Sequence, residues 1–379
     1  MAVYLDYNAT TPLDPRVLEA MLPYLTSQRG NPSSVHRYGR AARQAIDNAR
    51  EQVAALVRAH PSEVIFTSGG TEANNTALQG AAARLAPGRI AVSAVEHSSV
   101  LAAARALTAR GWRLDTIAVD GECRVTLPAL RARLKPDTRL VSVMMANNET
   151  GAVQDIAAIG RETRAAGAIM HTDAVQAAGK IALDFEACGA HLMSLSAHKL
   201  YGPQGVGALI VDKSVDLEPL LHGGGQEKNR RGGTENVAGI VGFGAAAELA
   251  VKEGAARAAV LRGLRDHLEA SLRALPPVVI FAERIERLPN TVQLSVPGID
   301  GETLLMALDR KGIAVSSGSA CASGSVEPSH VLMAMGVERE LARGAIRVSL
   351  GKENTRADVD AFISALREII DRLPAARAG

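Results

Sequence analysis

Seven short apolar runs alternate with helical patterns between residues 60 and 211, and this alternation restricts the possible folds more than any other feature. The runs lie at 63–67, 89–95, 113–119, 139–145, 168–171, 191–195 and 206–211. Ala-rich stretches of helical periodicity, such as 72–84 and 99–110, lie between them. Nearly continuous apolar strands that alternate with helices are typical of a mostly parallel sheet covered on both faces, although a short apolar run can also be a buried helix. The sequence thus predicts an α/β fold with a mostly parallel seven-stranded sheet.

The second half of the chain predicts a smaller α+β domain. A long helical stretch runs from about residue 245 to about residue 275, and strands are expected at 290–296 and 345–349. A chain of 379 residues is long enough for a large and a small domain. We expect residues 15–255 to form the large domain. Residues 1–14 and 256–379 would form the small one, with a loop around Cys321.

Composition excludes several classes of function. The net charge is +2 and Lys and Arg form no block, so nucleic-acid binding has no electrostatic support. No apolar run reaches the ~20 residues that a membrane-spanning helix needs, and the start has no secretory pattern. The three cysteines, at 123, 188 and 321, are too far apart for a disulfide framework or an intrinsic metal cluster. A reducing compartment, the cytoplasm, is therefore expected.

Polar residues follow five of the predicted strands. In order along the chain, these are Gly70 and Thr71, then His97, Asn148, the pair Asp173 and Gln176, and the group Ser196, His198 and Lys199. Ligands of open α/β sheets bind at the carboxyl ends of the strands, so these side chains should converge. Each residue taken alone is more simply a turn former, a helix cap or a core residue. Five such strand ends together favour a ligand site.

Lys199 indicates which ligand this would be. An unpaired ammonium directly after a buried strand is costly, and a Schiff base with an aldehyde cofactor removes that cost. A pyridine ring that serves as an electron sink needs a carboxylate beside its nitrogen, which Asp173 would supply. Gln176 or Asn148 suits the ring hydroxyl, and the imidazole of His97 suits the ring face. Gly70, Thr71, Ser196 and His198 would bind a phosphate, which together predicts pyridoxal 5'-phosphate (PLP).

Motifs along nearly the whole chain resemble those of one enzyme family. They are Tyr-Leu-Asp-Tyr-Asn-Ala-Thr-Thr-Pro at 4–12, Gly-Asn-Pro-Ser-Ser at 30–34, Phe-Thr-Ser-Gly-Gly-Thr-Glu at 66–72, Ala-Asn-Asn-Glu-Thr-Gly at 146–151, His-Thr-Asp-Ala-Val-Gln at 171–176, Arg-Gly-Gly-Thr-Glu-Asn at 231–236 and Ser-Ser-Gly-Ser-Ala-Cys at 316–321. The set is similar to that of the group I cysteine desulfurases of NifS/IscS type, which are class V, fold-type I PLP enzymes.

The resemblance implies a role for each of these residues. Lys199 would hold PLP and move the Cα proton, and His97 would stack on the ring and take part in proton transfer. Arg347 would bind the substrate carboxylate with help from Asn31. Thr234 would reach the phosphate of a neighbouring subunit, which implies a homodimer.

The resemblance also implies a reaction. L-cysteine would give L-alanine and a persulfide on Cys321, and the sulfur would pass to an acceptor protein for iron–sulfur cluster assembly. The one metal contact implied is a transient one between Cys321 and a cluster on a scaffold.

Two alternatives stay open at the level of sequence. Cys321 lies among small residues, and on composition alone it could be an incidental thiol in a solvated loop. A selenocysteine lyase, or another class V PLP lyase or aminotransferase, needs Lys199 and Asp173 but not in general Cys321. A scaffold protein without activity would be expected to lack one of the cofactor residues or the nucleophile, and all are present.

Overall fold

A seven-stranded sheet forms the centre of the larger part of the molecule. The computed structural model describes residues 2–317 and 327–372. In spatial order the strands are β2 (Val64–Thr67), β8 (Gly207–Val211), β7 (Leu192–Ser196), β6 (Ile169–Asp173), β5 (Thr138–Ser142), β3 (Arg89–Ser93) and β4 (Arg113–Ile117). Strand β8 runs antiparallel to both of its neighbours, and the other pairs are parallel. The predicted mostly parallel sheet is confirmed.

Two layers of helices cover the sheet, which explains why its strands are apolar throughout. Successive residues of a strand point to opposite faces. Ile90 and Val92 of β3 therefore join one core, and Ala91 between them joins the other. The helices of this part are α1 (Pro15–Thr26), α2 (Arg37–Leu56), α3 (Gly70–Asn75), α4 (Ala81–Ala83), α5 (Ser98–Thr108), α6 (Leu127–Arg131) and α7 (Ile156–Ala165), with a π-helical turn η2 (Thr76–Gly80) that joins α3 to α4.

The smaller part is built on an antiparallel sheet. Its strands, in spatial order, are β12 (Ser316–Ser317), β13 (Ala345–Ser349), β10 (Thr291–Ser295) and β9 (Val279–Ile280). Strand β1 (Val3–Tyr4) pairs in parallel with β11 (Ile313–Ala314), so the start of the chain belongs to this part. The helices are α9 (Gly301–Asp309), α10 (His330–Ala334), α11 (Arg339–Arg343) and α12 (Arg356–Asp371).

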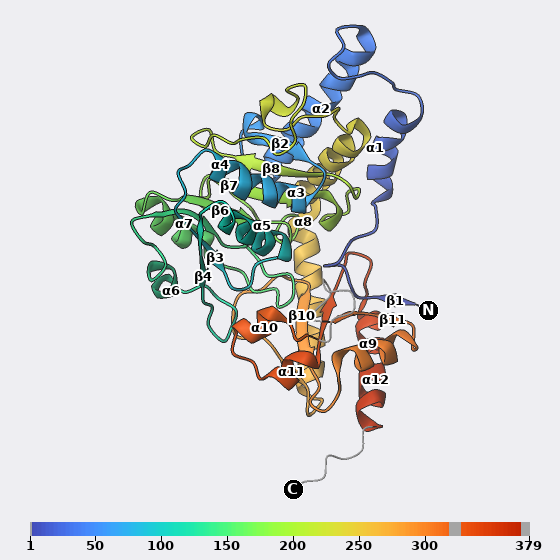
Figure 1. Cartoon of the computed structure of the whole chain (residues 1–379). Coiled ribbons are helices and arrows are strands. Elements are labelled where there is room, and N and C mark those ends of the chain that lie inside the picture. The colour runs from blue at the N-terminus through green and yellow to red at the C-terminus, as the bar shows by residue number, and fades with distance from the viewer. Residues whose placement is uncertain (1, 318–326, 373–379) are drawn as a thin grey trace.

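One long helix, α8 (Val237–Arg273), runs from the larger part into the smaller one (Figure 1). Ile240 and Phe243 near its start pack in the core of the seven-stranded sheet. Leu261 and Leu268 near its end pack in the core of the small sheet, together with Val3 of β1. This change of core along α8 supports the division into residues 15–255 on one side and residues 1–14 and 256–379 on the other, which stays a prediction.

A buried ion pair fixes the long loop that precedes α8. Glu227, in the 3-10 turn η4 (Glu227–Asn229), accepts hydrogen bonds from Arg50 of α2 at 2.7 and 2.8 Å. It also accepts one from the backbone N–H of Phe66 in β2 at 2.9 Å. Both charged side chains are buried. The loop is thereby tied to a helix and to an edge strand of the sheet.

We expect Glu227→Ala to destabilise the protein strongly, because Arg50 would be left as a buried charge without its carboxylate. Loss of one partner of a buried pair typically costs about 3–5 kcal/mol. Calorimetry should show a fall of several degrees in the first thermal transition. Glu368→Ala is the control, since this carboxylate is exposed and its ion pair with Lys311 should contribute little to stability. Equal effects of the two variants would contradict this prediction.

Candidate active site

A single cavity of about 840 Å³ collects the residues that follow the strands. It lies at the carboxyl ends of the parallel strands, where ligands of such sheets bind. Ten of the residues predicted from the sequence line it: Gly70, Thr71, His97, Asn148, Asp173, Gln176, Ser196, His198, Lys199 and Arg347. The predicted convergence of the strand ends is therefore present in the structure.

Asp173 is held as an acceptor at the end of β6. One carboxylate oxygen accepts from Asn74 Nδ2 at 2.7 Å, and the other accepts from the backbone N–H of Val175 at 3.0 Å. The side chain is buried, and it lines the cavity. Because both carboxylate oxygens are held by donors, the carboxylate has a fixed orientation and is suited to accept from the N–H of a ring nitrogen.

His97 lies one residue before α5 and caps this helix. Its Nδ1 accepts from the backbone N–H of Ser99 at 3.2 Å and lies 2.7 Å from the Ser99 hydroxyl. Nδ1 therefore carries the lone pair, and in the neutral ring Nε2 carries the proton. Burial lowers the pKa of His97, with an opposing effect of Asp173 and a smaller lowering by Lys199 and His330. The neutral ring is thus an N–H donor at Nε2, and it can take a proton only at Nδ1, on the side of Ser99.

Lys199 lies in the 3-10 turn η3 (Ala197–Lys199) directly after β7. Its Nζ donates to the backbone carbonyls of Asn8 and Ala9, both at 2.6 Å. These carbonyls belong to the N-terminal segment that crosses from the small sheet to α1. The amine is only partly buried and faces the cavity. It is therefore held at the site by acceptors that carry no charge.

The turn at the start of α3 suits a phosphate. Helix α3 begins at Gly70, and the first N–H groups of a helix have no partner within it. A Cβ at Gly70 would lie 2.8 Å from Val175 Cγ2, so only glycine fits this close approach. Ser196 and His198 lie beside this turn, and burial lowers the pKa of His198 to about 4, with a smaller effect of Lys199. His198 is therefore a neutral hydrogen-bonding group there, and Nδ1 lies 3.1 Å from Thr10 Oγ1.

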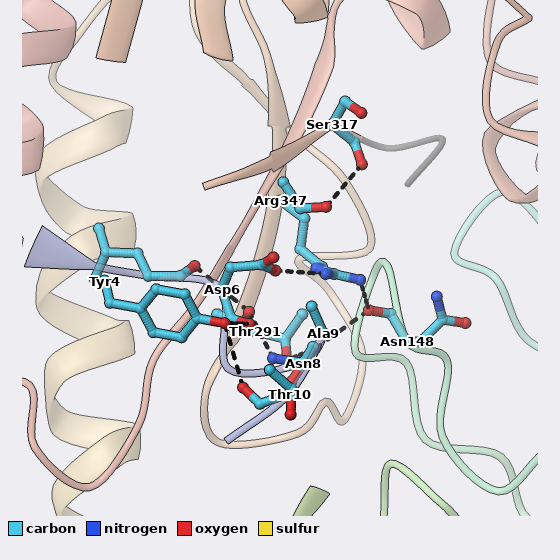
Figure 2. Close-up of polar contacts among 12 residues, drawn as sticks. Tyr4, Asp6, Asn8, Ala9, Thr10, Asn148, Thr291, Ser317 and Arg347 are labelled. Atoms are coloured by element: carbon cyan, nitrogen blue, oxygen red, sulfur yellow. Dashed lines mark hydrogen bonds and ion pairs between the residues drawn. The ribbon is translucent and has the colours of Figure 1, made fainter. Parts of the chain in front are cut away.

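Arg347 reaches the cavity from β13 of the small sheet. It is buried, donates to the carboxylate of Asp6 at 2.6 Å and donates to the backbone carbonyl of Asn148 at 2.9 Å (Figure 2). Its Nε has no hydrogen-bond partner within the described residues. A buried N–H without a partner is costly, and a bound carboxylate would satisfy it.

The donor set fits PLP. Asp173 offers a carboxylate for the ring nitrogen, His97 an imidazole, and Lys199 an amine for the aldehyde. The first turn of α3 with Thr71, Ser196 and His198 offers donors for the phosphate. Gly70 lets the backbone come close to the bound group, and Arg347 has an Nε donor without a hydrogen-bond partner among the described residues.

Three predicted residues lie outside this arrangement. Asn31 is exposed, and its side chain accepts from the backbone N–H of Ser33 at 2.9 Å instead of lining the cavity. Thr234 is also exposed and away from the lining, so its proposed contact with a neighbouring subunit stays a prediction. Cys321 lies in 318–326, outside the described residues.

Sequence reasoning missed several polar residues that support the site. Asn74 in α3 links Asp173 to Ser99, to whose Oγ it donates at 2.9 Å. Asn8 accepts from Lys199, and Lys180 donates to Asn8 Oδ1 at 2.9 Å. His330 enters the lining from α10 and its Nε2 lies 3.0 Å from the carbonyl of Glu96. The motif at 4–12 was the one available signal for Asn8, and Asn74 gives none, because a polar residue inside a helix is ordinary.

A chain of buried polar groups crosses the sheet below the cavity. His171 of β6 lies between Ser142 of β5 and Ser194 of β7, at 2.8 and 3.0 Å from their hydroxyls. Complete burial lowers the pKa of His171 to about 4. Glu96 is fully buried next to this chain, accepts from Ser93 Oγ at 2.5 Å, and has its pKa raised by burial to about 8. Both groups are therefore neutral at neutral pH.

Within residues 2–317 and 327–372, no group of His, Cys, Asp and Glu side chains could hold a metal ion. No helix in those same ranges is long and apolar enough to cross a bilayer.

The fold and the cavity belong to a known class of enzyme. The family model described as aminotransferase class V matches residues 3–362, and the chain belongs to that family.

Within this family, several proteins similar to this chain are named cysteine desulfurases. A cysteine desulfurase of Cereibacter sphaeroides is 48% identical, and the match covers 98% of this chain and 97% of that protein. The cysteine desulfurase IscS of Dictyoglomus turgidum is 45% identical over 98% of this chain and 95% of its own length. A solved NifS-like protein superimposes with a TM-score of 0.92 at 40% identity, over 98% of this chain and all of that one. The resemblance seen in the sequence motifs is confirmed.

The stability of the fold should depend on pH through His171. Its folded pKa of about 4 lies below the ordinary value of 6.5, so only the unfolded chain takes up a proton between these values. The stabilisation by the neutral ring is therefore present above pH 6.5 and is lost as the pH falls toward 4.

We expect His171→Asn to destabilise the protein more at pH 7 than at pH 5, by about 2 kcal/mol. Denaturant unfolding of the variant and of the unaltered protein at the two pH values measures this difference. The titration of Glu96 affects both proteins alike, so its effect cancels when their free energies of unfolding are compared. An equal loss at pH 7 and pH 5 would contradict the assignment.

Proposed function

We propose that the protein is a PLP-dependent cysteine desulfurase that converts L-cysteine to L-alanine and receives the sulfur as a persulfide on Cys321. The observation that carries this proposal is the single cavity lined by Asp173, His97, Lys199 and Arg347, with a phosphate cradle at Gly70. Relatives that match over nearly the whole chain bear the same name, which supports the reaction.

Each residue would have a defined task. Arg347 binds the substrate carboxylate, and its Nε provides the donor that has no partner among the described residues. Lys199 Nζ takes the proton from Cα of the substrate. Asp173 keeps the ring nitrogen protonated, and His97 covers the ring and donates through Nε2. When bound, PLP supplies the electron sink that makes the Cα proton acidic.

The sulfur transfer needs a thiolate as nucleophile. The Cys321 thiolate attacks the substrate sulfur, an S–S bond forms, and the Cβ–S bond breaks with its electron pair left on the alanine fragment. That carbon then takes a proton. The two described cysteines are unsuited to this task, because burial raises the pKa of Cys123 to about 12 and also raises the pKa of Cys188.

The product would be passed on to other proteins. A persulfide is reactive and would be handed to an acceptor, which we propose to be an iron–sulfur scaffold protein because the relatives include proteins named IscS. A cytoplasmic location, inferred from the cysteine pattern, stays a prediction.

We further propose a homodimer, which exposed apolar side chains support. Leu18, Leu22 and Leu25 lie at intervals of four and three residues along α1 and are 46%, 50% and 59% exposed. This spacing places them on one face of the helix. Leu220 and Leu221 are exposed at the start of the loop that carries Thr234. A second copy of the chain would cover such a surface.

Replacing the nucleophile tests the reaction directly. With radiolabelled L-cysteine, Cys321→Ala should lose the protein-bound persulfide, and alanine formation should fall on the order of a hundredfold or more. Cys188→Ala is the matched control, and it should keep both products because its thiol is buried. Full alanine and sulfide production by Cys321→Ala would overturn the proposed mechanism.

Introducing charged residues on the apolar face of α1 tests whether this face forms the dimer interface. Leu18→Glu combined with Leu22→Glu should give a monomer in analytical ultracentrifugation, because two carboxylates cannot be buried there without partners. Met306→Glu is the control, since Met306 is an exposed apolar residue on α9 of the smaller part. A dimer that persists in the double variant would refute this interface.

A further inference from the structure

A second lysine lies beside Lys199 and has no place in the proposed reaction. Lys180 follows β6 by a short turn, four residues after Gln176, and it is only partly exposed. Its Nζ donates to Gln176 Oε1 at 2.7 Å and to Asn8 Oδ1 at 2.9 Å. Both acceptors are amide oxygens, so neither hydrogen bond pairs the lysine with a carboxylate.

These contacts fix which way the amide of Gln176 points. Its oxygen accepts from Lys180, while its Nε2 donates to the carbonyl of Asn8 at 2.9 Å. A carbonyl can only accept, so the two contacts assign the same orientation. Gln176 lines the cavity, and its NH₂ group has a second hydrogen available. The amide thus offers the site a donor, whereas the flipped amide would offer an oxygen.

The same lysine also holds Asn8. Asn8 Oδ1 accepts from Lys180 and from Asn290 Nδ2 at 3.1 Å, and Asn8 Nδ2 donates to Thr291 Oγ1 at 2.9 Å. The carbonyl of Asn8 is the acceptor of Lys199. One hydrogen bond therefore connects Lys180 to Gln176. Asn8 connects Lys180 to Lys199, because its side chain accepts from Lys180 and its backbone carbonyl accepts from the amine that would carry the cofactor.

The charges around Lys180 agree with a role in the site. The cations Lys199 and Arg347 interact with it, and Arg347 forms an ion pair with Asp6. Burial, followed by these two cations, holds the pKa of Lys180 well below its ordinary value. A group kept in such surroundings at an energetic cost is more commonly found at a functional site than elsewhere.

We infer that Lys180 is a positioning residue that fixes the amide of Gln176 with its NH₂ group toward the ring oxygen of the bound cofactor. This inference rests on the proposed function, because it takes the ligand to be PLP. Lys180 itself touches neither the substrate nor the reacting atoms. Its effect would appear in the ionisation of the bound cofactor, since an N–H donor at the ring oxygen stabilises the deprotonated form.

The test is a pH titration of the visible absorbance of the PLP-loaded protein. Lys180→Met should raise the midpoint by about one pH unit, the size expected for loss of one hydrogen bond to a charged group. Gln176→Leu should raise it by a similar amount. The double variant should shift no further than either single variant, because both remove the same donor. Lys180→Gln, which also lacks the ammonium, replaces Lys180→Met if that variant fails to fold.

Lys252→Met is the matched control, because this lysine lies exposed on α8 and pairs with Glu248. Its midpoint should equal that of the unaltered protein. An unchanged midpoint in the Lys180 variant, or a double variant that shifts by the sum of the two single shifts, would overturn the inference. An unaltered protein that shows no visible band with PLP would instead overturn the proposed function, and this inference with it.

Discussion

The buried side chain and carbonyl of Asn8 hold the two sheets in one arrangement. Its side chain bonds Thr291 of the small sheet and Lys180 in the turn that follows β6 of the large sheet, and its carbonyl accepts from Lys199 and Gln176. A buried polar group without a hydrogen-bond partner destabilises the folded state by as much as several ordinary side-chain contacts stabilise it. The two parts of the molecule can therefore meet in few ways that satisfy Asn8, and the cavity between them is formed in the arrangement that does.

The sequence predicted those features of the site that depend on local patterns such as apolar runs. The ends of β6 and β7 could be read from their apolar runs, and parallel strands must bring Asp173 and Ser196 to one edge of the sheet. Asn8 could not be found in this way, because its partners lie up to 341 positions away along the chain. No periodicity connects such residues; only the folded chain brings them together. The same holds for Arg347, whose role came from the resemblance.

Asn74 and Ser99, which support the site residues, could not be predicted from the sequence for a different reason. Asn74 looks like an ordinary polar residue of a helix, and Ser99 like a residue of a first helical turn. Both residues belong to one path of hydrogen bonds. Asn74 donates to Asp173 and to the hydroxyl of Ser99, and the backbone N–H of Ser99 donates to His97. The path fixes both the orientation of a carboxylate and the tautomer of an imidazole. Sequence could predict that Asp173 and His97 meet, but not which nitrogen of His97 carries the proton.

The charges of the cavity explain why its ligands should be anions. Lys199, Arg347 and Asp173 line one cavity, and Asp6 pairs with Arg347. The carboxyl group of Glu96 does not add to the anions, because burial raises its pKa to about 8. Burying a cation is costly, and that cost falls when an anion such as a phosphate or a carboxylate binds beside it. The site is thus stabilised by the kind of ligand on which the proposed reaction depends.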